Sequence, residues 1–359
     1  MKVLYLINYA GSGGSERYVE LLAKYYHGSK CDCGLCYNVD GPLVEKMKAL
    51  GISVHQLPMK NILDLSAAKK LAKIVKGGAY DVIHAQYPRE NYIAILSRFF
   101  GCKAKIVFTS HLIMEQPPVW RMLNRIFTPH DHAVLTVCTY GKEVLERGGV
   151  AKDKIRIVFN GVNAAAAPER DRSILREFGI GDEEKVITIL TRFSEEKGVP
   201  FLLRSIAKLK AKTAVPFRLL LVGTGPDFDR DKALVPQLGI EDKVVLTGFR
   251  SDTAQLLAAS DIYLNSSSSE AMSFAILEAL GAGLPLVLTR VGGNPELVNT
   301  GEVCGELVPY GDEEGYAAAI ARLLEDEALR SRYAAAARAK AQGEFDLYNL
   351  LEKLYKIYQ

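Results

Sequence analysis

The chain opens with KVLYLINYAGSGGSER, residues 2–17, and this stretch decides the class of fold. The apolar run Lys2–Asn8 predicts a buried strand, and glycines lead from it into a helix expected over Glu16–Tyr26. Glycines let a backbone approach a ligand closely, and the N-terminus of a helix offers N–H groups to a phosphate. The opening therefore predicts a strand–turn–helix unit of the Rossmann kind.

The same alternation of strand and helix continues along the chain and predicts parallel sheets covered on both faces. With 359 residues, the chain has the length of about two domains. Turn-type residues at Asn160-Gly161-Val162-Asn163 mark the junction. We expect an N-terminal Rossmann-like domain over 1–162, a second over 163–343, and a C-terminal helix over 344–359 that crosses back to the first. The expected strands are Lys2–Asn8, Cys31–Tyr37, Ser53–Leu57, Val82–Ala85, Lys105–Thr109, Ala133–Cys138, Ile155–Phe159, Val186–Leu190, Arg218–Val222, Val244–Thr247, Ile262–Asn265 and Pro285–Leu288.

Charge is distributed unevenly between the two halves. Residues 1–160 carry a net charge of +9 and residues 161–359 a net charge of −6, within a total of +3. A basic half suggests an anionic partner, and the candidates are phosphates, an anionic membrane surface and nucleic acid, although a solvated, lysine-rich helix face would carry the same charge. The motifs described below favour the first two partners, and no nucleic acid is expected. No apolar run is long enough to span a bilayer, and six cysteines fit a reducing compartment. We expect a cytoplasmic protein, peripheral on the inner face of the membrane.

The sharpest chemical signal is the segment Glu270–Glu278, in which seven residues separate two glutamates. If a helix begins inside it, Glu270 stands just before the electropositive end and Glu278 about two turns further on, on roughly the same side. Backbone N–H groups of Met272, Ser273 and Phe274 would then bind a phosphate between the carboxylates. The pattern suits a sugar–diphosphate–nucleoside laid along the helix.

These residues belong to a series that resembles retaining glycosyltransferases of the GT-B fold, glycosyltransferase family 4 (group 1). The likeness extends along nearly the whole chain, in the family's order and spacing. It includes an alanine, Ala271, where the family commonly has glycine, and an asparagine, Asn163, where it usually has aspartate. The matching segments are Gly13-Gly14-Ser15-Glu16, Thr109-Ser110-His111, Asn160-Gly161-Val162, Arg192 to Lys197-Gly198, Gly248-Phe249-Arg250, Glu270 to Glu278, and Gly292-Gly293-Asn294-Pro295-Glu296.

The resemblance implies a role for each matching residue. Arg192 and Lys197 would neutralise the donor diphosphate, and Glu278 would hold the ribose hydroxyls. Glu270 would hold the sugar ring, and His111 would hydrogen-bond the sugar. On this reading the catalytic set is His111, Glu270, Arg192 and Lys197. The donor-binding set is Gly13, Gly14, Arg192, Lys197, Gly223, Phe249, Arg250, Met272, Ser273, Phe274 and Glu278.

The resemblance also implies the reaction, the cofactor requirement and the partners. A hexose would move from a nucleoside-diphosphate sugar, with UDP-hexose favoured, to a hydroxyl acceptor with retention of configuration. The acceptor would be a lipid-linked or polysaccharide glycan. Neither a cofactor nor a metal is expected, and the Asp-x-Asp spacings at Asp227, Asp229 and Asp231 are interpreted as the acidic first turn of a helix.

Other functions remain open at this point. A sugar-nucleotide epimerase of the same fold binds the same donors without an acceptor, and Ala271 hints at a non-catalytic sugar-nucleotide-binding protein. A nicotinamide-dependent oxidoreductase would require a complete G-x-G-x-x-G, but Glu16 stands where the third glycine belongs.

Overall fold

The computed structural model describes residues 1–11, 13–111, 113 and 117–359. They form two compact units, Met1–Phe159 with Leu351–Gln359 (unit 1) and Asn160–Leu350 (unit 2). None of the helices in these ranges is long and apolar enough to cross a bilayer.

Unit 1 is built on a parallel sheet whose strands lie in the order β3-β2-β1-β4-β5-β6-β7. The strands are β1 (Lys2–Tyr9), β2 (Asp32–Val39), β3 (Ser53–Gln56), β4 (Val82–Ala85), β5 (Lys105–Ser110), β6 (Ala133–Thr136) and β7 (Ile155–Ile157). The helices are α1 (Gly14–Tyr26), α2 (Pro42–Ala49), α3 (Leu65–Gly78), α4 (Pro88–Leu96), α5 (Pro118–Phe127), α6 (Thr139–Arg147) and the end of α14 (Leu347–Tyr358).

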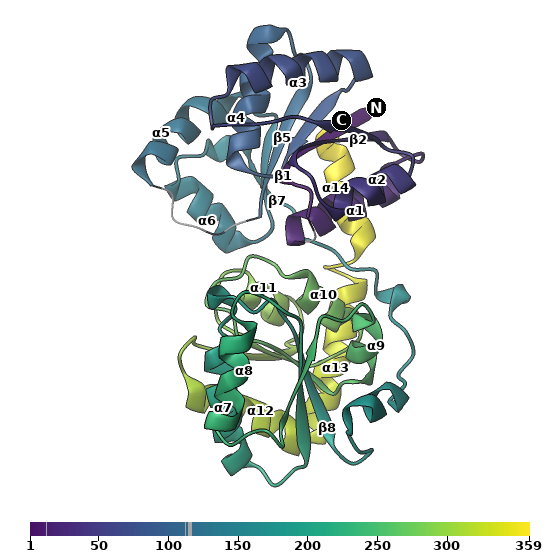
Figure 1. Ribbon diagram of the computed structural model, residues 1–359, viewed down its shortest axis with the longest axis vertical. Helices are drawn as coiled ribbons and strands as arrows, with labels where there is room; N and C mark the ends of the chain where they lie inside the picture. The colour runs from purple at the N-terminus through teal and green to yellow at the C-terminus, as the bar shows by residue number, and fades with distance from the viewer. Residues whose placement is uncertain (12, 112, 114–116) are drawn as a thin grey trace. The chain divides into compact units, whose positions relative to one another are not determined.

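Apolar side chains on both faces of this sheet explain why helices cover both (Figure 1). On one face, Leu4 of β1 and Ile83 of β4 share a buried cluster with Leu71 of α3. On the other face, the ring of His84 contacts Tyr18 of α1 and Tyr358 of α14. The C-terminal helix is therefore part of the core of unit 1.

Unit 2 repeats the plan with a parallel sheet in the order β10-β9-β8-β11-β12-β13. The strands are β8 (Lys185–Leu190), β9 (Phe217–Val222), β10 (Val244–Gly248), β11 (Ile262–Asn265), β12 (Leu286–Thr289) and β13 (Gly305–Val308). The helices are α7 (Val199–Lys212), α8 (Phe228–Gln237), α9 (Thr253–Ala259), α10 (Phe274–Gly281), α11 (Asn294–Asn299), α12 (Glu313–Glu325) and α13 (Glu327–Gln342), with 3-10 turns η4 (Ala164–Ala166), η5 (Ser173–Phe178) and η6 (Glu195–Lys197).

The two segments that connect the units pair with each other. Val162 donates its N–H to Phe345 O at 2.9 Å, and Leu347 returns an N–H to Val162 O at 3.0 Å. A Cβ on Gly161 would lie 2.7 Å from the Cα of Leu347, so this close pairing requires glycine. The turn-type sequence at the junction thus has a packing reason as well as a conformational one.

The predicted class of two parallel, doubly wound sheets is confirmed, with small shifts at strand ends and one strand that was not expected. That strand, β13, pairs with β12. Cys33 and Cys36 lie in β2 as buried free thiols, as their interpretation as strand residues requires. Helix α13 ends at Gln342 with Gly343 as its C-cap, next to the expected start of the C-terminal helix at residue 344.

Candidate active site

In unit 2 the site lies where the strand order reverses, between β8 and β11. In open parallel sheets, ligands bind outside the carboxyl ends of the strands at such a switch point. The loops that follow β8 and β11 are joined here by two hydrogen bonds to backbone carbonyl oxygens. Ser268 donates its N–H to Glu196 O at 2.8 Å, and the Ser266 hydroxyl donates to Lys197 O at 2.8 Å. These hydrogen bonds therefore hold the loop after β8 and the loop after β11 against each other.

Gly198 makes this joining possible. Its φ is +63°, and a Cβ there would lie 2.2 Å from Ser266 O. Any other residue would force the two loops apart, because a backbone oxygen cannot move away as a flexible side chain can. The lysine that precedes this glycine is thereby aimed at the loop after β11.

Lys197, in the loop after β8, and Glu270, in the loop after β11, form an ion pair. The Nζ of Lys197 lies 2.7 Å from Oε2 of Glu270, and the two side chains are only 24% and 11% exposed. The hydroxyl of Ser267 also donates to Oε2 of Glu270, at 3.3 Å. A partly buried, charge-assisted hydrogen bond of this kind is stronger than a bond between neutral groups. The Lys197 ammonium has further N–H donors that can bind a second anion.

Helix α10 carries Glu278, and its position on the same side as Glu270 stays a prediction. Burial raises the pKa of the Tyr263 hydroxyl in β11. The negative charges of Glu278 and Glu270 raise that pKa further. Helix α10 makes its first intrahelical hydrogen bond from Leu277 N–H to Ser273 O. The amides of Phe274 to Ile276 precede that bond and form the electropositive helix end.

The turn between Glu270 and α10 is fixed from two further directions. Buried Asn160 donates through Nδ2 to the carbonyl oxygen of Met272 at 3.0 Å. Gly293, at the start of α11, donates its N–H to Glu270 O at 3.1 Å. Sequence reasoning missed these supports and the serine contacts between the loops, because each joins segments far apart in the chain.

Three other predicted donor-binding residues of unit 2 differ from one another in exposure and packing. Arg192 is exposed on the loop after β8. Gly223 packs against that loop, since its φ is +131° and a Cβ would lie 1.9 Å from Thr191 O. Phe249 is 78% exposed at the end of β10.

The guanidinium of Arg250 is engaged by two carboxylates. Nη1 pairs with Oε1 of Glu177 at 2.6 Å, and Nη2 with Oδ2 of Asp252 at 2.6 Å. Arg250 thus ties η5 to the start of α9. This geometry does not bring it to the Lys197–Glu270 pair, and its contact with a donor stays a prediction.

In unit 1 the strand order reverses between β1 and β4, and the predicted residues lie near the carboxyl ends of strands on that edge. Gly13 caps α1 and Gly14 begins it. Among the described residues, no atom beyond the chain neighbours and the helix's own backbone lies within 4 Å of a Cβ built on Gly14. Ser12 of the same turn lies outside the described residues. Phosphate binding by the turn therefore stays a prediction.

His111 follows β5, and its ring lies against Gln86 and Tyr18. His111 Nε2 is 2.8 Å from Gln86 Oε1, and the ring centroid is 5.0 Å from that of Tyr18. Burial lowers the pKa of His111 to about 4, so the imidazole is neutral at neutral pH. Sequence reasoning singled out His111 and missed Gln86.

Metal ligands do not gather in the described parts of the chain: no three His, Cys, Asp or Glu side chains there could hold an ion together. Asp227 caps α8, and Asp229 and Asp231 lie in its first turn, as interpreted from the sequence. Whether a metal takes part in the reaction stays a prediction.

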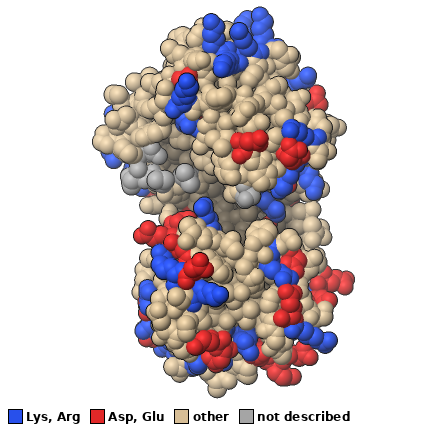
Figure 2. All heavy atoms as spheres, in the orientation of Figure 1, with Lys and Arg blue, Asp and Glu red and all other residues tan. Residues whose placement is uncertain are grey.

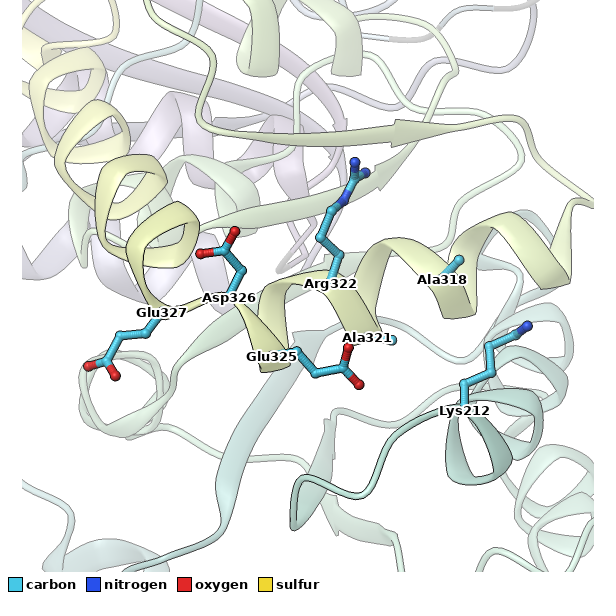
Figure 3. A pocket seen from close by; sticks show the side chains of 7 residues that line it. All are labelled: Lys212, Ala318, Ala321, Arg322, Glu325, Asp326 and Glu327. Atoms are coloured by element: carbon cyan, nitrogen blue, oxygen red, sulfur yellow. The ribbon is translucent and has the colours of Figure 1, made fainter.

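A shallow cavity of about 640 Å³ lies elsewhere in unit 2, between the end of α7 and the α12–α13 junction (Figure 3). None of the predicted site residues lines it. Its lining residues are Lys212, Ala318, Ala321, Arg322, Glu325, Asp326 and Glu327.

Two units of this kind, each built on a doubly wound parallel sheet, are the architecture of GT-B glycosyltransferases. The model of glycosyl transferases group 1 matches residues 171–340, and that of glycosyltransferase family 4 matches residues 12–166. The chain belongs to glycosyltransferase family 4 (group 1), and it is a glycosyltransferase.

Individual relatives and solved structures agree with this assignment. The chain is 32% identical to N-acetyl-alpha-D-glucosaminyl L-malate synthase of Bacillus anthracis, over 85% of this chain and 81% of the relative. It is 25% identical, over 92% of each chain, to N-acetylgalactosamine-N,N'-diacetylbacillosaminyl-diphospho-undecaprenol 4-alpha-N-acetylgalactosaminyltransferase of Campylobacter jejuni. The fold matches Anabaena HepE in complex with UDP and glucose with a TM-score of 0.85 and 22% identity, over 99% of this chain and 98% of that one. The epimerase and sensor alternatives receive no support from these likenesses.

Proposed function

We propose that this protein transfers a hexose from a nucleoside-diphosphate sugar, with UDP-hexose favoured, to an acceptor hydroxyl with retention of configuration. The observation that carries the proposal is the Lys197–Glu270 pair at the switch point of unit 2, beside the helix α10 that carries Glu278. A ligand with both negative phosphates and hydroxyl groups would use a cation, a helix N-terminus and two carboxylates together.

Each part of the site suits one part of that donor. Lys197 and Arg192 neutralise the diphosphate, and Met272, Ser273 and Phe274, at and just before the start of α10, supply amide donors. Glu278 accepts from the ribose hydroxyls, and Glu270 accepts from hydroxyls of the sugar. Gly13 and Gly14 offer the N-terminal end of α1 in unit 1 to the same phosphates. Gly223, after β9, and Phe249, after β10, would lie beside the nucleotide part of the donor.

The chemical step proceeds on one face of the sugar. The bond between the anomeric carbon and the phosphate oxygen breaks as the acceptor oxygen bonds to that carbon. The acceptor's proton passes to the departing phosphate oxygen, and Lys197 and Arg192 stabilise the developing charge. Glu270 is engaged by Lys197 and Ser267, which suits a carboxylate that steadies positive charge rather than a nucleophile. With cations in this role, we propose that no metal is needed.

The acceptor is a lipid-linked or polysaccharide glycan, handled by unit 1 at an anionic membrane surface. Helix α5 supports this part of the proposal. Its inner face is fixed by Asn124, which accepts from the hydroxyl of Tyr92 at 2.6 Å. Its outer face exposes Val119, Met122 and Ile126 by 54–59%. An apolar, exposed helix face flanked by cations is typical of helices that lie on anionic lipid.

Basic side chains flank that apolar face and extend over a second helix. Arg121 and Arg125 are exposed on α5, and Lys69, Lys70, Lys73 and Lys76 are exposed on α3. Figure 2 shows Lys and Arg gathered over α3. The Campylobacter relative is named for a diphospho-undecaprenol acceptor, which supports a lipid-linked acceptor. The location follows as cytoplasmic, peripheral on the inner face of the membrane.

The test is product analysis by NMR. Purified protein is incubated with UDP-glucose, UDP-galactose or UDP-N-acetylglucosamine and a panel of lipid-linked and soluble hydroxyl acceptors. The expected product keeps the α configuration of the donor at the anomeric carbon. An inverted product would overturn the same-face mechanism, and epimerised donor without transfer would overturn the assignment of the reaction.

A further inference from the structure

Gln86 has one allowed amide orientation, which its neighbours determine. It follows β4 and is fully buried. Its Nε2 donates to the carbonyl oxygen of His84 at 3.0 Å. Reversing the amide would set two oxygens against each other, so Oε1 must point away from that carbonyl. It points at His111 Nε2, 2.8 Å away.

The orientation of Gln86 determines which nitrogen of His111 carries the proton. An amide oxygen only accepts, so the partner nitrogen must donate. A neutral imidazole has one N–H, and here it is Nε2–H, which leaves Nδ1 as an acceptor. Among the described residues, Gln86 is the hydrogen-bond partner that the structure gives this ring.

Side chains of α1 and of the core of unit 1 lie near the ring of His111. Tyr18 packs against His111 with its ring plane at 69°. Thr109, in β5, shares a hydrogen bond of 2.7 Å with His84 Nε2, whose Nδ1 is in turn 2.6 Å from the hydroxyl of Tyr358 in the C-terminal helix. The polar side chains of Thr109, His84 and Tyr358 are thus linked to one another in the core of unit 1, close to the ring of His111.

We propose that Gln86 is a positioning residue that holds His111 as the Nε2–H tautomer, so that His111 accepts through Nδ1 a hydrogen bond from a hydroxyl of the donor sugar. The sugar contact rests on the proposed function, whereas the tautomer does not. On this account His111 is neither a proton donor to the leaving phosphate nor a cation beside it. A donor that lacks the hydroxyl in question leaves Nδ1 unpaired and is used poorly.

The first arm of the test is a long-range ¹H–¹⁵N NMR spectrum of the imidazole nitrogens at neutral pH. His111→Gln identifies the His111 signals by their disappearance. The expected wild-type pattern has a protonated Nε2 and an unprotonated Nδ1. Gln86→Met, which keeps the length but not the acceptor, should shift the pattern toward the other tautomer. Gln86→Glu, which keeps an acceptor oxygen, should restore it. A wild-type Nδ1–H tautomer, or no change in Gln86→Met, overturns the proposal.

The second arm measures turnover of UDP-glucose with Gln86→Met and Gln86→Glu. We expect Gln86→Met to lower kcat roughly tenfold or more with little change in KM, and Gln86→Glu to recover part of the loss. Equal kcat in wild type and Gln86→Met would overturn the sugar contact. If Glu278→Ala leaves UDP-glucose binding intact, the proposed function fails, while the NMR arm still decides the tautomer.

Discussion

The ammonium of Lys197 lies 2.7 Å from the carboxylate of Glu270, although 73 residues separate them in the chain. They meet because β8 and β11 are neighbours in the sheet and the loops after them are bound through Ser266 and Ser268. Lys197 is thereby held where a donor diphosphate would approach the helix end of α10.

Lys197→Met should lower kcat by about a hundredfold to a thousandfold, because it removes a cation that stabilises charge on the leaving phosphate. It should also lower the free energy of unfolding by about 1–3 kcal/mol, since Glu270 loses its partner in a partly buried place. Steady-state kinetics and urea unfolding check both numbers. Lys208→Met, which breaks an exposed pair with Glu314 on the same unit, is the matched control. Unchanged kcat in Lys197→Met would contradict its role.

Glu278→Ala should act on donor affinity more than on kcat, because ribose hydroxyls are bound equally in the ground state and the transition state. Loss of hydrogen bonds to a charged acceptor predicts a rise in donor KM of about 10- to 100-fold. Glu325→Ala, an exposed glutamate at the end of α12, should leave KM unchanged. A large fall in kcat with constant KM would show that Glu278 acts in the chemical step instead.

Two glycines predicted to touch the donor should respond differently to alanine. Gly223→Ala places a Cβ against Thr191 O at a positive φ, and we expect the free energy of unfolding to fall by more than about 2 kcal/mol. Gly14→Ala adds a Cβ at a helix start without close contact to other described residues, and we expect a change of less than about 1 kcal/mol. Urea unfolding of both variants measures this difference, and equal stability of the two would contradict it.

The contribution of His84 to the stability of unit 1 should fall as the pH is lowered from about 6.5 toward 3. Burial lowers the pKa of His84 to about 3, whereas its unfolded value is about 6.5. In that window the unfolded chain binds a proton that the folded chain does not, and each pH unit costs about 1.4 kcal/mol. Above pH 6.5 both states are neutral and the contribution is constant.

The fluorescence of Trp120, the single tryptophan, follows urea unfolding of this unit. Between pH 7 and pH 5, His84→Gln should lose about 2 kcal/mol less stability than the wild type. The exposed His130→Gln should behave as the wild type does. Parallel pH profiles for wild type and His84→Gln would show that His84 is protonated in the folded protein.

Flotation with liposomes tests the membrane part of the proposal. Wild-type protein should float with vesicles containing phosphatidylglycerol in preference to pure phosphatidylcholine. Met122→Asp combined with Ile126→Asp should reduce binding at least about tenfold, because two side chains no longer enter the apolar boundary. Val303→Asp, an exposed apolar residue of unit 2, is the control. No preference of the wild type for anionic vesicles would contradict the proposal.

The fold was largely predictable because buried parallel strands have a clear apolar signature. Strand β13 was missed because its four residues, Gly305–Val308, include a glycine and a glutamate. Gly305 fits there because a Cβ would lie 2.2 Å from Leu286 O, a reason visible only once β12 is beside it.

The candidate site was predictable where a motif is local and unpredictable where distant segments meet. The spacing of Glu270 and Glu278 predicts that both lie on one side of the helix. The negative charges of both carboxylates raise the pKa of Tyr263. No sequence motif predicts the contact of Arg250 with Glu177 or that of Gln86 with His111. Both contacts depend on which segments the fold brings together.

The central claim is a nucleoside diphosphate site at the Lys197–Glu270 pair, and calorimetric titration with UDP, GDP and ADP tests it most directly. We predict binding at a single site, strongest for UDP, lost in Lys197→Met and weakened in Glu278→Ala. Absence of binding by all three nucleotides at millimolar concentration to folded wild-type protein, or equal binding by wild type and Lys197→Met, would contradict the account.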